Sequence, residues 1–599
     1  MKKIFTHFGI LILVAILCSP KDLKAENGQM MFVAVLTAFD EVPPVLSDGL
    51  GLVTFIFSED RKEVFIHGAF TDLSGPITGC HIHLGSSDTT GPVIFDLSAL
   101  ITGNRIKGAL PVSTKSLYQF AVSGLLYVNV HTDANPSGEI RGTLIQMSEF
   151  VLPVIASAQN QIPPVASNAG GLGALRFSQY LTRVDYQFLP VGLSGPATAA
   201  HIHMGNSSTN GPVIAPLNTG DFITGSITDQ TMVEDIFFAA VVGQAYLNVH
   251  TAANPTGEIR GQLIYDQPNN ASSVLNGSQE TPPVNTTAKA YGYASVDFPN
   301  LDSITYAVVY SGLVPTAAHI HKAKAGLSGP VIIPLKLSNA PGFYFGRAAL
   351  SDDNFTAFLK DELYFNIHSA ANPSGEIRGQ IENNIYKSFA FDVCGDQEVP
   401  KKTVNGYGAS FVAVNKGNTE AIYGLLVDGL TGPATAAHIY DGAFGVNGSV
   451  MVTLATPGPL SVDILPIAGT TGGKIDLDGA YVNVHTAANP SGEIRGQVRR
   501  SLSCSINVGT VESAIQDITL SNTLVNDILY LKANSDKNID ANFYVSDISG
   551  KKLMQWTNTN FISGSNSISF IVDALSSGFY LLNLVDENNS IRSFKFVKQ

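Results

Sequence analysis

Residues 126–142 read LYVNVHTDANPSGEIRG, and nearly the same string recurs three times along the chain. HTDANPSGEIRG begins at His131, HTAANPTGEIRG at His250, HSAANPSGEIRG at His368 and HTAANPSGEIRG at His485. Successive copies are 119, 118 and 117 residues apart. This period is much longer than one repeat of a solenoid protein and is typical of a domain with its own hydrophobic core. The sequence therefore predicts four copies of one domain, following each other as separate modules on short linkers.

Two further markers keep the same step. His-Ile-His occurs at residues 81–83, 201–203 and 319–321, and the fourth copy reads His438-Ile439-Tyr440. Each copy also opens on a Pro-rich turn, namely Glu41-Val42-Pro43-Pro44, Gln161-Ile162-Pro163-Pro164, Glu280-Thr281-Pro282-Pro283 and Glu398-Val399-Pro400. We expect the repeats to cover residues 28–147, 150–266, 272–384 and 388–504.

Within a repeat the pattern predicts β-strands. Runs such as Gly51–Phe57 and Leu126–His131 are rich in β-branched and aromatic residues, and turn residues separate such runs at roughly 8–12-residue intervals. No stretch shows a sustained helical period of apolar residues. The turn at residues 135–138, Asn-Pro-Ser-Gly, should close a hairpin between the His131 strand and the Glu139–Arg141 strand. The expected fold class is all-β, each repeat being a sandwich or a barrel.

The composition excludes several classes of function. The chain has 599 residues, of which 45% are hydrophobic and 14% charged, and its formal net charge is −14. It is too apolar to be disordered, and it lacks the Lys/Arg clusters that nucleic acids and anionic membranes reward. Residues 1–25 have the pattern of a secretory signal peptide, and no later segment is apolar enough to span a membrane. We expect an exported, soluble protein with no nucleic-acid partner.

Cys80, Cys394 and Cys504 remain once that peptide is removed. Cys394 lies in the opening strand of the fourth repeat, and Cys504 lies just beyond its closing strand. Because first and last strands often lie side by side in a sandwich, we expect a Cys394–Cys504 disulfide, the alternative being two free thiols. Cys80 points to the face opposite His81 and is expected in the core. Residues 515–599 carry neither marker and no His, and they predict a separate small β-domain.

Most of the histidines belong to a polar surface that recurs in every repeat. Because side chains alternate along a strand, His81 and His83 share one face, and so do Tyr127, Asn129 and His131. Glu and Arg likewise flank an apolar Ile in the closing strand, so the polar groups should lie on the side of the sheet away from the core. The polar-face residues are Tyr127, Asn129, Glu139, Arg141, Tyr246, Asn248, Glu258, Arg260, Tyr364, Asn366, Glu376, Arg378, Tyr481, Asn483, His485, Glu493 and Arg495.

Two interpretations of this surface stay open. If the His-x-His strand lies beside the Asn-x-His strand, three imidazoles converge, as in an open Zn or Cu site that a Glu or a water completes. Alternatively the groups form a hydrogen-bonded structural face, in which Glu pairs with Arg and protects a hairpin edge. The fourth repeat favours the structural face, because Tyr440 replaces its second His. The candidate metal ligands are His81, His83, His131, His201, His203, His250, His319, His321 and His368.

At these residues the sequence resembles the CHRD domain, first described in chordin and widespread in bacterial secreted proteins. The resemblance rests on the Glu-x-Pro-Pro opening, Gly-Pro-x-x-x-x-His-Ile-His, Gly-Pro-Val-Ile and Asn-Val-His followed by Asn-Pro-x-Gly-Glu-Ile-Arg-Gly. It covers about residues 28–500, with departures at Val314-Pro315, Tyr440 and Gly448-Ser449. The resemblance implies immunoglobulin-like or barrel-like β-sandwiches and leaves the biochemical role open.

Two shorter resemblances bear on function. His-x-His followed by Asn-Val-His is similar to the copper-ligand strands of Cu/Zn superoxide dismutase, without a counterpart for the zinc ligands. Residues 515–599 resemble the C-terminal sorting domain of the bacterial type IX secretion system, through Asp527–Leu531, Tyr544–Lys552, Leu575–Tyr580 and Phe594–Lys598. This implies the type IX machinery as a partner and export through the periplasm of a Gram-negative bacterium to the cell surface or medium.

These observations predict a function for the whole chain. Four similar surfaces on one chain raise avidity, so we expect a non-enzymatic protein that binds or adheres to an unknown extracellular protein or carbohydrate. The alternative is a metal-binding module for Cu or Zn, with possible redox activity like that of superoxide dismutase.

Overall fold

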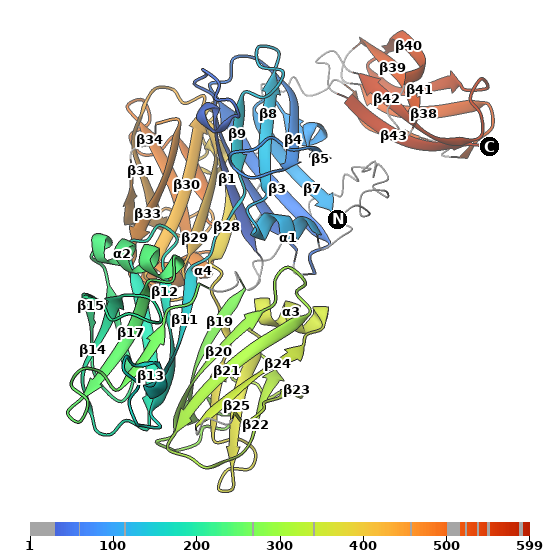
Figure 1. Ribbon diagram of the computed structural model, residues 1–599. Coiled ribbons are helices and arrows are strands. Elements are labelled where there is room, and N and C mark those ends of the chain that lie inside the picture. Colours follow the sequence, from blue (N-terminus) through green and yellow to red (C-terminus); the bar gives the residue numbers. More distant parts are fainter. Residues whose placement is uncertain are drawn as a thin grey trace. The chain divides into compact units, whose positions relative to one another are not determined.

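The structure, a computed structural model, describes residues 30–58, 60–112, 116–265, 269–338, 342–455, 458–499, 515–520, 524–535, 538–547, 552–585 and 591–599. The expected signal peptide lies outside these residues. The chain divides into two compact units, Met1–Cys504 and Ser505–Gln599. The first unit holds the four repeats and the second holds the C-terminal domain, as the colours of Figure 1 show.

Repeat 1 is a single antiparallel sheet with the strand order β5-β4-β8-β9-β1-β2-β3-β7-β6, and β10 pairs with β1. Ile82 on β4 and Ile106 on β7 come from opposite ends of this order, yet they belong to one apolar core, so the sheet folds over on itself. The elements are β1 (Met31–Thr37), β2 (Leu50–Phe57), β3 (Glu63–Thr71), β4 (Ile77–Leu84), β5 (Val93–Asp96), β6 (Ile101–Thr102), β7 (Arg105–Pro111), α1 (Ser116–Val122), β8 (Leu126–Thr132), β9 (Ile140–Thr143) and β10 (Ile145–Gln146).

Repeats 2, 3 and 4 keep the same sheet order. Repeat 2 contains β11 (Phe150–Ser157), β12 (Gly170–Phe177), β13 (Val184–Val191), β14 (Ala197–Met204), β15 (Val213–Leu217), β16 (Ile223–Ile227), α2 (Gln230–Val241), β17 (Ala245–Thr251) and β18 (Ile259–Gln262). Repeat 3 contains β19 (Asn270–Asn276), β20 (Lys289–Val296), β21 (Ser303–Ser311), β22 (Pro315–Lys322), β23 (Val331–Pro334), β24 (Phe343–Ala349), α3 (Asp352–Leu359), β25 (Leu363–Ser369), β26 (Ile377–Gln380) and β27 (Glu382–Asn383). Repeat 4 contains β28 (Lys387–Cys394), β29 (Tyr407–Val414), β30 (Glu420–Asp428), β31 (Ala434–Asp441), β32 (Val450–Leu454), β33 (Leu460–Pro466), α4 (Gly469–Asp476), β34 (Ala480–Thr486) and β35 (Ile494–Gln497).

The hairpin at the repeated motif forms as expected. β8 pairs antiparallel with β9, Val130 lying opposite Ile140. β4, which carries His-Ile-His, pairs with the other side of β8. Ile82 and Cys80 are fully buried in the core, so the two histidines of β4 lie on the other face of the strand.

One short helix precedes the Asn-x-His strand of each repeat, and the sequence analysis did not predict these four helices. They span seven to twelve residues, too few turns for an apolar period to stand out from the surrounding β pattern. In repeat 2, Asp229 caps the helix by accepting a hydrogen bond from the Met232 backbone N–H. Val233 and Ile236 attach the helix to the core.

The repeats are not separate modules on linkers, which corrects the expectation from their length. Leu52 and Ile56 on the outer face of the β1-β2-β3 layer share an apolar cluster with Phe411 and Leu426 of repeat 4. The corresponding faces of repeats 2 and 3 form a second such cluster. Repeats 1 and 3 also meet, since the Tyr118 hydroxyl donates to Asn269 Oδ1 over 3.1 Å. The four repeats therefore form one packed unit, in which the first lies against the fourth, the second against the third, and the first also against the third.

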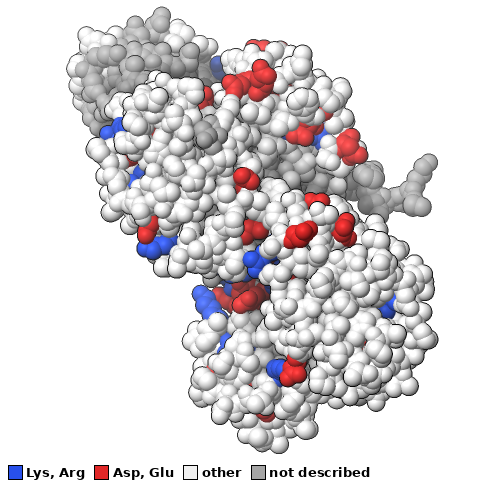
Figure 2. Space-filling view, turned by 90° about the vertical axis from the view of Figure 1, so that its left-hand side faces the viewer, with Lys and Arg blue, Asp and Glu red and all other residues white. Residues whose placement is uncertain are grey.

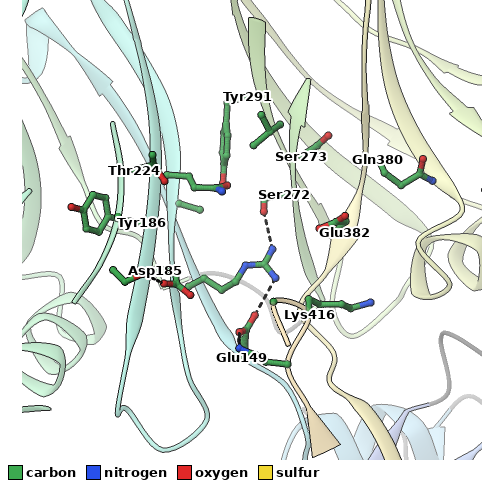
Figure 3. Close-up of a pocket in the computed structure, with 18 of the residues that line it drawn as sticks. Glu149, Asp185, Tyr186, Thr224, Ser272, Ser273, Tyr291, Gln380, Glu382 and Lys416 are labelled. Atoms are coloured by element: carbon green, nitrogen blue, oxygen red, sulfur yellow. Dashed lines mark hydrogen bonds and ion pairs between the residues drawn. The ribbon is translucent and has the colours of Figure 1, made fainter. Parts of the chain in front are cut away.

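A cavity of about 400 Å³ lies where repeats 2, 3 and 4 approach each other (Figure 3). Arg176 crosses it, with one Nη 3.1 Å from Glu149 Oε2 and the other donating to Ser272 Oγ over 2.8 Å. On the same side of the unit, Tyr386 and Thr182 both donate to Glu420. Because residues of three repeats line it and Arg176 of repeat 2 donates to Ser272 of repeat 3, we assign this cavity to the interface between repeats.

The C-terminal unit is a small β-sandwich. Its two sheets have the orders β36-β38-β41 and β37-β43-β42-β39-β40, and residues of both, such as Leu529 and Phe543, share one core. The strands are β36 (Ile515–Leu520), β37 (Leu524–Val525), β38 (Ile528–Ser535), β39 (Ile539–Asp547), β40 (Lys552–Phe561), β41 (Gly564–Ile571), β42 (Gly578–Val585) and β43 (Ile591–Lys598).

Candidate metal centres

Three histidines converge in repeat 1 because of the register between β4 and β8. His81 lies opposite Asn129, His83 opposite Tyr127, and His131 opposite Gly79. Nδ1 of His81 lies 3.0 Å from Nε2 of His131. One ring nitrogen from each of the three histidines lies within 4.8 Å of the other two.

Backbone carbonyls fix the tautomers of two of these rings. Nδ1 of His83 is 2.9 Å from the Gly91 carbonyl oxygen, and Nδ1 of His131 is 3.1 Å from the Pro136 carbonyl oxygen. A carbonyl oxygen only accepts, so both Nδ1 atoms carry the proton and both Nε2 atoms keep a lone pair. Nε2 of His83 is buried without a hydrogen-bond partner. Metal-ligating histidines are commonly held by such a hydrogen bond from the second nitrogen.

Repeats 2 and 3 reproduce this arrangement. Nδ1 of His201 lies 3.2 Å from Nε2 of His250, and Nδ1 of His319 lies 3.0 Å from Nε2 of His368. Nδ1 of His203 and of His321 donates to the carbonyl of Gly211 and Gly329 over 3.0 and 2.9 Å. The nine candidate ligands from the sequence therefore gather into three clusters, one per repeat.

Repeat 4 departs from this arrangement at one position. Tyr440 takes the place of the second His, and its hydroxyl lies 3.1 Å from Nε2 of His485, whose Nδ1 donates to the Pro490 carbonyl. The phenol hydroxyl thus occupies the space in front of the His485 lone pair. Nδ1 of His438 is left buried without a hydrogen-bond partner.

The expected polar surface is a buried polar layer, which corrects its placement. Every Tyr, Asn, Glu and Arg of that group is at most 8% exposed, and Arg141 is 1% exposed. The Arg141 guanidinium stacks over the Tyr127 ring at 3.5 Å, and His83 stacks on the other side of that ring, with centroids 4.8 Å apart. Short loops above the sheet cover these side chains, which sequence periodicity alone does not reveal.

The expected pairing of Glu with Arg is also wrong. Glu139 accepts hydrogen bonds from the hydroxyls of Ser47, Ser74 and Thr132 over 2.5–2.6 Å, and it takes no part in the histidine cluster. Burial alone would raise the pKa of Glu139, but these hydrogen bonds lower it to about 2. β9 also lies between β8 and β1, so these charges do not protect a sheet edge.

A carboxyl that the sequence analysis did not single out lies beneath the Asn-x-His strand. Glu41 of the Pro-rich turn accepts from Asn129 Nδ2 over 3.4 Å, while Glu41 Oε1 and Asn129 Oδ1 are both buried without a partner. Burial raises the pKa of Glu41 to about 7. In repeat 2 the amide of Gln161 donates to Asn248 Oδ1 over 2.6 Å. The Pro-rich turns that open the repeats carry Glu in repeats 1, 3 and 4 and Gln161 in repeat 2. This difference was the sign in the sequence that the position contacts the buried Asn.

The electrostatic setting favours neutral imidazoles. Burial lowers the pKa of His83 and of His131 below the ordinary value. The same holds for His203, His321 and His368. Neutral imidazoles offer lone pairs to a cation.

The face shown in Figure 2 is largely uncharged, with acidic and basic side chains scattered over it.

The cysteines behave in two ways. Cys80 is a buried free thiol, and burial raises its pKa. Cys394 is disulfide-bonded, and its strand β28 pairs with β35, the closing strand of the same repeat. The expected partner Cys504 lies outside the described residues, so the pairing with Cys394 stays a prediction.

The four repeats share one fold and one buried polar layer, built from Tyr-x-Asn-x-His and Glu-Ile-Arg. They are therefore copies of one class of domain, which a family profile identifies. The CHRD domain profile matches residues 32–144, 152–263, 271–381 and 389–498. The chain belongs to the CHRD domain family. A second profile, the secretion system C-terminal sorting domain, matches residues 525–599.

Known proteins extend this comparison. Chordin of Danio rerio is 28% identical over 188 residues, covering 28% of this chain and 20% of that protein. Chordin of Xenopus laevis is 20% identical over 536 residues, covering 81% of this chain and 54% of that protein. An alignment with a crystal structure of Salmonella alpha-2-macroglobulin covers 92% of this chain and 38% of the macroglobulin chain at 9% sequence identity. Its TM-score is 0.13, so we draw no conclusion about fold or function from it. Within the described residues, no helix has the length and apolarity needed to cross a membrane.

Proposed function

We propose that this secreted or cell-surface CHRD protein binds one transition-metal ion in each of its first three repeats. The observation that supports this most is the convergence of three ring nitrogens within 4.8 Å in each of the first three repeats. In each cluster two rings are already held in the tautomer that directs Nε2 inward. The fourth repeat, where the hydroxyl of Tyr440 fills the same space, has no site.

The donor set selects the class of metal. Three imidazoles suit Zn²⁺ or Cu²⁺, whereas Ca²⁺ and Mg²⁺ prefer oxygen ligands. Metal–nitrogen bonds of about 2.0–2.1 Å in a tetrahedron put two ligand nitrogens about 3.3 Å apart. In each cluster, Nδ1 of the first His of His-Ile-His lies 3.0–3.2 Å from Nε2 of the Asn-x-His histidine, which is close to this value. A metal held by these three nitrogens would keep its fourth coordination position open to water.

Elemental analysis of the full chain, loaded with Zn²⁺ or Cu²⁺ and freed of excess, tests the proposal. We expect near three equivalents, and none at micromolar metal would refute it. His81→Ala should lose one equivalent without unfolding its repeat, because that residue lies off the core. His438→Ala in repeat 4 is the matched control and should leave the metal content unchanged.

For the three histidine clusters we propose metal binding and no catalytic activity. The family matches give no support for the redox activity suggested by the short similarity to superoxide dismutase. The chain spans about half or less of the length of the chordins that it matches, so no ligand is carried over from those relatives.

We also propose that the exported chain binds an extracellular protein or carbohydrate, since four similar repeats are delivered together outside the cell. Their packing against each other removes the free movement that avidity between separate modules exploits, so any such partner meets one rigid unit. A glycan array and a pull-down with the whole four-repeat unit would test this, and no binder in either would refute it.

The route of delivery follows from the sorting domain. We propose that residues 1–25 direct the chain into the periplasm of a Gram-negative bacterium and that the type IX machinery then recognises residues 515–599. Deleting residues 515–599 should leave the repeats in the periplasm, whereas their arrival in the medium would refute this route.

A further inference from the structure

Arg141 is a buried cation whose hydrogen bonds go to a loop. Its Nη2 donates to the Ser86 carbonyl over 2.5 Å and to the Thr89 carbonyl over 2.8 Å. Both acceptors belong to the loop between β4 and β5. A guanidinium can hold two carbonyls at once because its N–H groups lie in a fixed plane. Arg141 therefore fixes this loop to the sheet.

The same loop carries the acceptor that orients a candidate ligand. The Gly91 backbone N–H donates to the Tyr127 hydroxyl over 3.0 Å, and the Gly91 carbonyl accepts from Nδ1 of His83 over 2.9 Å. A Cβ on Gly91 would lie 1.7 Å from the Leu84 carbonyl oxygen, so only glycine fits there. The position of the loop and the tautomer of His83 are thus linked through one residue, Gly91.

The connection recurs in the other repeats with candidate metal sites. Arg260 donates to the carbonyls of Asn206 and Thr209, and Arg378 to those of Lys324 and Leu327. Each of these loops ends in a glycine whose N–H donates to a Tyr hydroxyl and whose carbonyl accepts from the second His of the marker. Each arginine also stacks on that Tyr at 3.5–3.6 Å.

We propose that Arg141, Arg260 and Arg378 are positioning residues of the metal sites, each holding the loop carbonyl that keeps the second His with Nε2 directed at the cation. This inference rests on the proposed function. Within the described residues these arginines donate to loop carbonyls and not to the clustered histidines, so they act through the loop and the Tyr ring. Losing such an indirect support typically weakens metal binding 10–100-fold.

Repeat 4 provides an internal control. Arg495 donates to the carbonyls of Ala443 and Val446 over 3.2 and 2.9 Å and stacks on Tyr481 at 3.4 Å, so the support is present. The ligand that it would position is replaced by Tyr440. A substitution of Arg495 therefore disturbs the same contacts with the loop and the Tyr ring, but in a repeat that has no metal site whose affinity could fall.

The test compares Arg141→Lys with Arg495→Lys in the full chain, because lysine keeps the charge but lacks the planar guanidinium that stacks on the Tyr ring and donates to the loop carbonyls in a fixed geometry. Titration with Zn²⁺ should show one of three sites weakened about 10–100-fold in Arg141→Lys and three unchanged sites in Arg495→Lys. Three unchanged sites in Arg141→Lys would overturn the inference. Equal weakening by both variants would also overturn it, since the effect would then be a general loss of structure.

A metal-free measurement separates this inference from the proposed function. NMR of the chain with ¹⁵N-labelled histidine rings reports which nitrogen carries the proton. In Arg141→Lys we expect the His83 signal alone to move from the Nδ1–H form to a mixture, and an unmoved His83 would overturn the inference even if the wild-type chain binds no metal. Tyr127→Phe, which keeps the ring but removes the acceptor for Gly91 N–H, should shift the same signal less, with Tyr481→Phe as its control.

Discussion

Replacing Tyr440 with His should create a fourth metal site in repeat 4. The other parts are present: Nδ1 of His438 is buried without a partner, and Nδ1 of His485 is held by the Pro490 carbonyl. The Gly448 N–H donates to the Tyr481 hydroxyl over 3.1 Å, as its counterparts do in the other repeats. Tyr440→His therefore removes the one group that fills the cation position and supplies the third imidazole.

The energies have opposite signs with and without metal. The metal-free variant loses the Tyr440–His485 hydrogen bond, which costs about 1 kcal/mol of unfolding free energy. With metal at 100 times the dissociation constant, binding to the folded state contributes about 2.7 kcal/mol. We expect Tyr440→His to unfold slightly earlier than wild type in a chelator and later in excess Zn²⁺.

Elemental analysis of the loaded full chain gives the decisive number. We expect four equivalents for Tyr440→His against three for wild type, and two for the reverse change, His83→Tyr. A variant that stays at three equivalents, although it folds and wild type binds three, would refute the reasoning that the tyrosine hydroxyl alone blocks the site.

The remaining predictions concern stability. Burial raises the pKa of Glu41 and Glu280 to about 7 and that of Glu398 to about 6, so the folded repeats bind protons that the unfolded chain has released. The stability that these three carboxyls contribute should be complete below about pH 4.5 and be lost as pH rises through 7, and the difference in thermal unfolding between wild type and a triple Glu→Gln variant should show this slope. Asp392, partly buried between repeats 1 and 4, lies 2.7 Å from His67 Nε2 and 2.9 Å from Lys107 Nζ, so Asp392→Asn should cost about 2 kcal/mol in denaturant unfolding, and a change below about 0.5 kcal/mol would contradict the pairing. Arg176→Met leaves Glu149 as a buried unpaired charge and should cost about 3 kcal/mol, which urea titration measures, whereas Arg347→Met at an exposed pair should change little.

Some features of the candidate site were predictable because they depend on strand periodicity alone. Alternation along β4 put His81 and His83 on one face with Ile82 in the core, and the Asn-Pro-Ser-Gly turn identified the β8–β9 hairpin. The burial of Arg141 was not predictable, since its partners are backbone carbonyls of a loop, which no residue type announces. The same limit hid the acceptors of Glu139, three hydroxyls scattered over the repeat.

The packing of repeats against each other had a signal that periodicity arguments missed. Residues 51–57 are buried on both faces, with Val53 and Phe55 in the core of repeat 1 and Leu52 and Ile56 against repeat 4. A strand covered on both sides reads as a continuous apolar run. Residues 51–57 lack the alternating polar positions that a strand with one exposed face would show, and this absence was the sign that a second repeat covers the strand.

The pairing of the first repeat with the last sets an order for folding. During synthesis the outer face of repeat 1 emerges long before its cover in repeat 4, so Leu52 and Ile56 stay in contact with water until the whole four-repeat unit has been made. A chain cut off after its third repeat would keep this apolar face exposed and be prone to self-association.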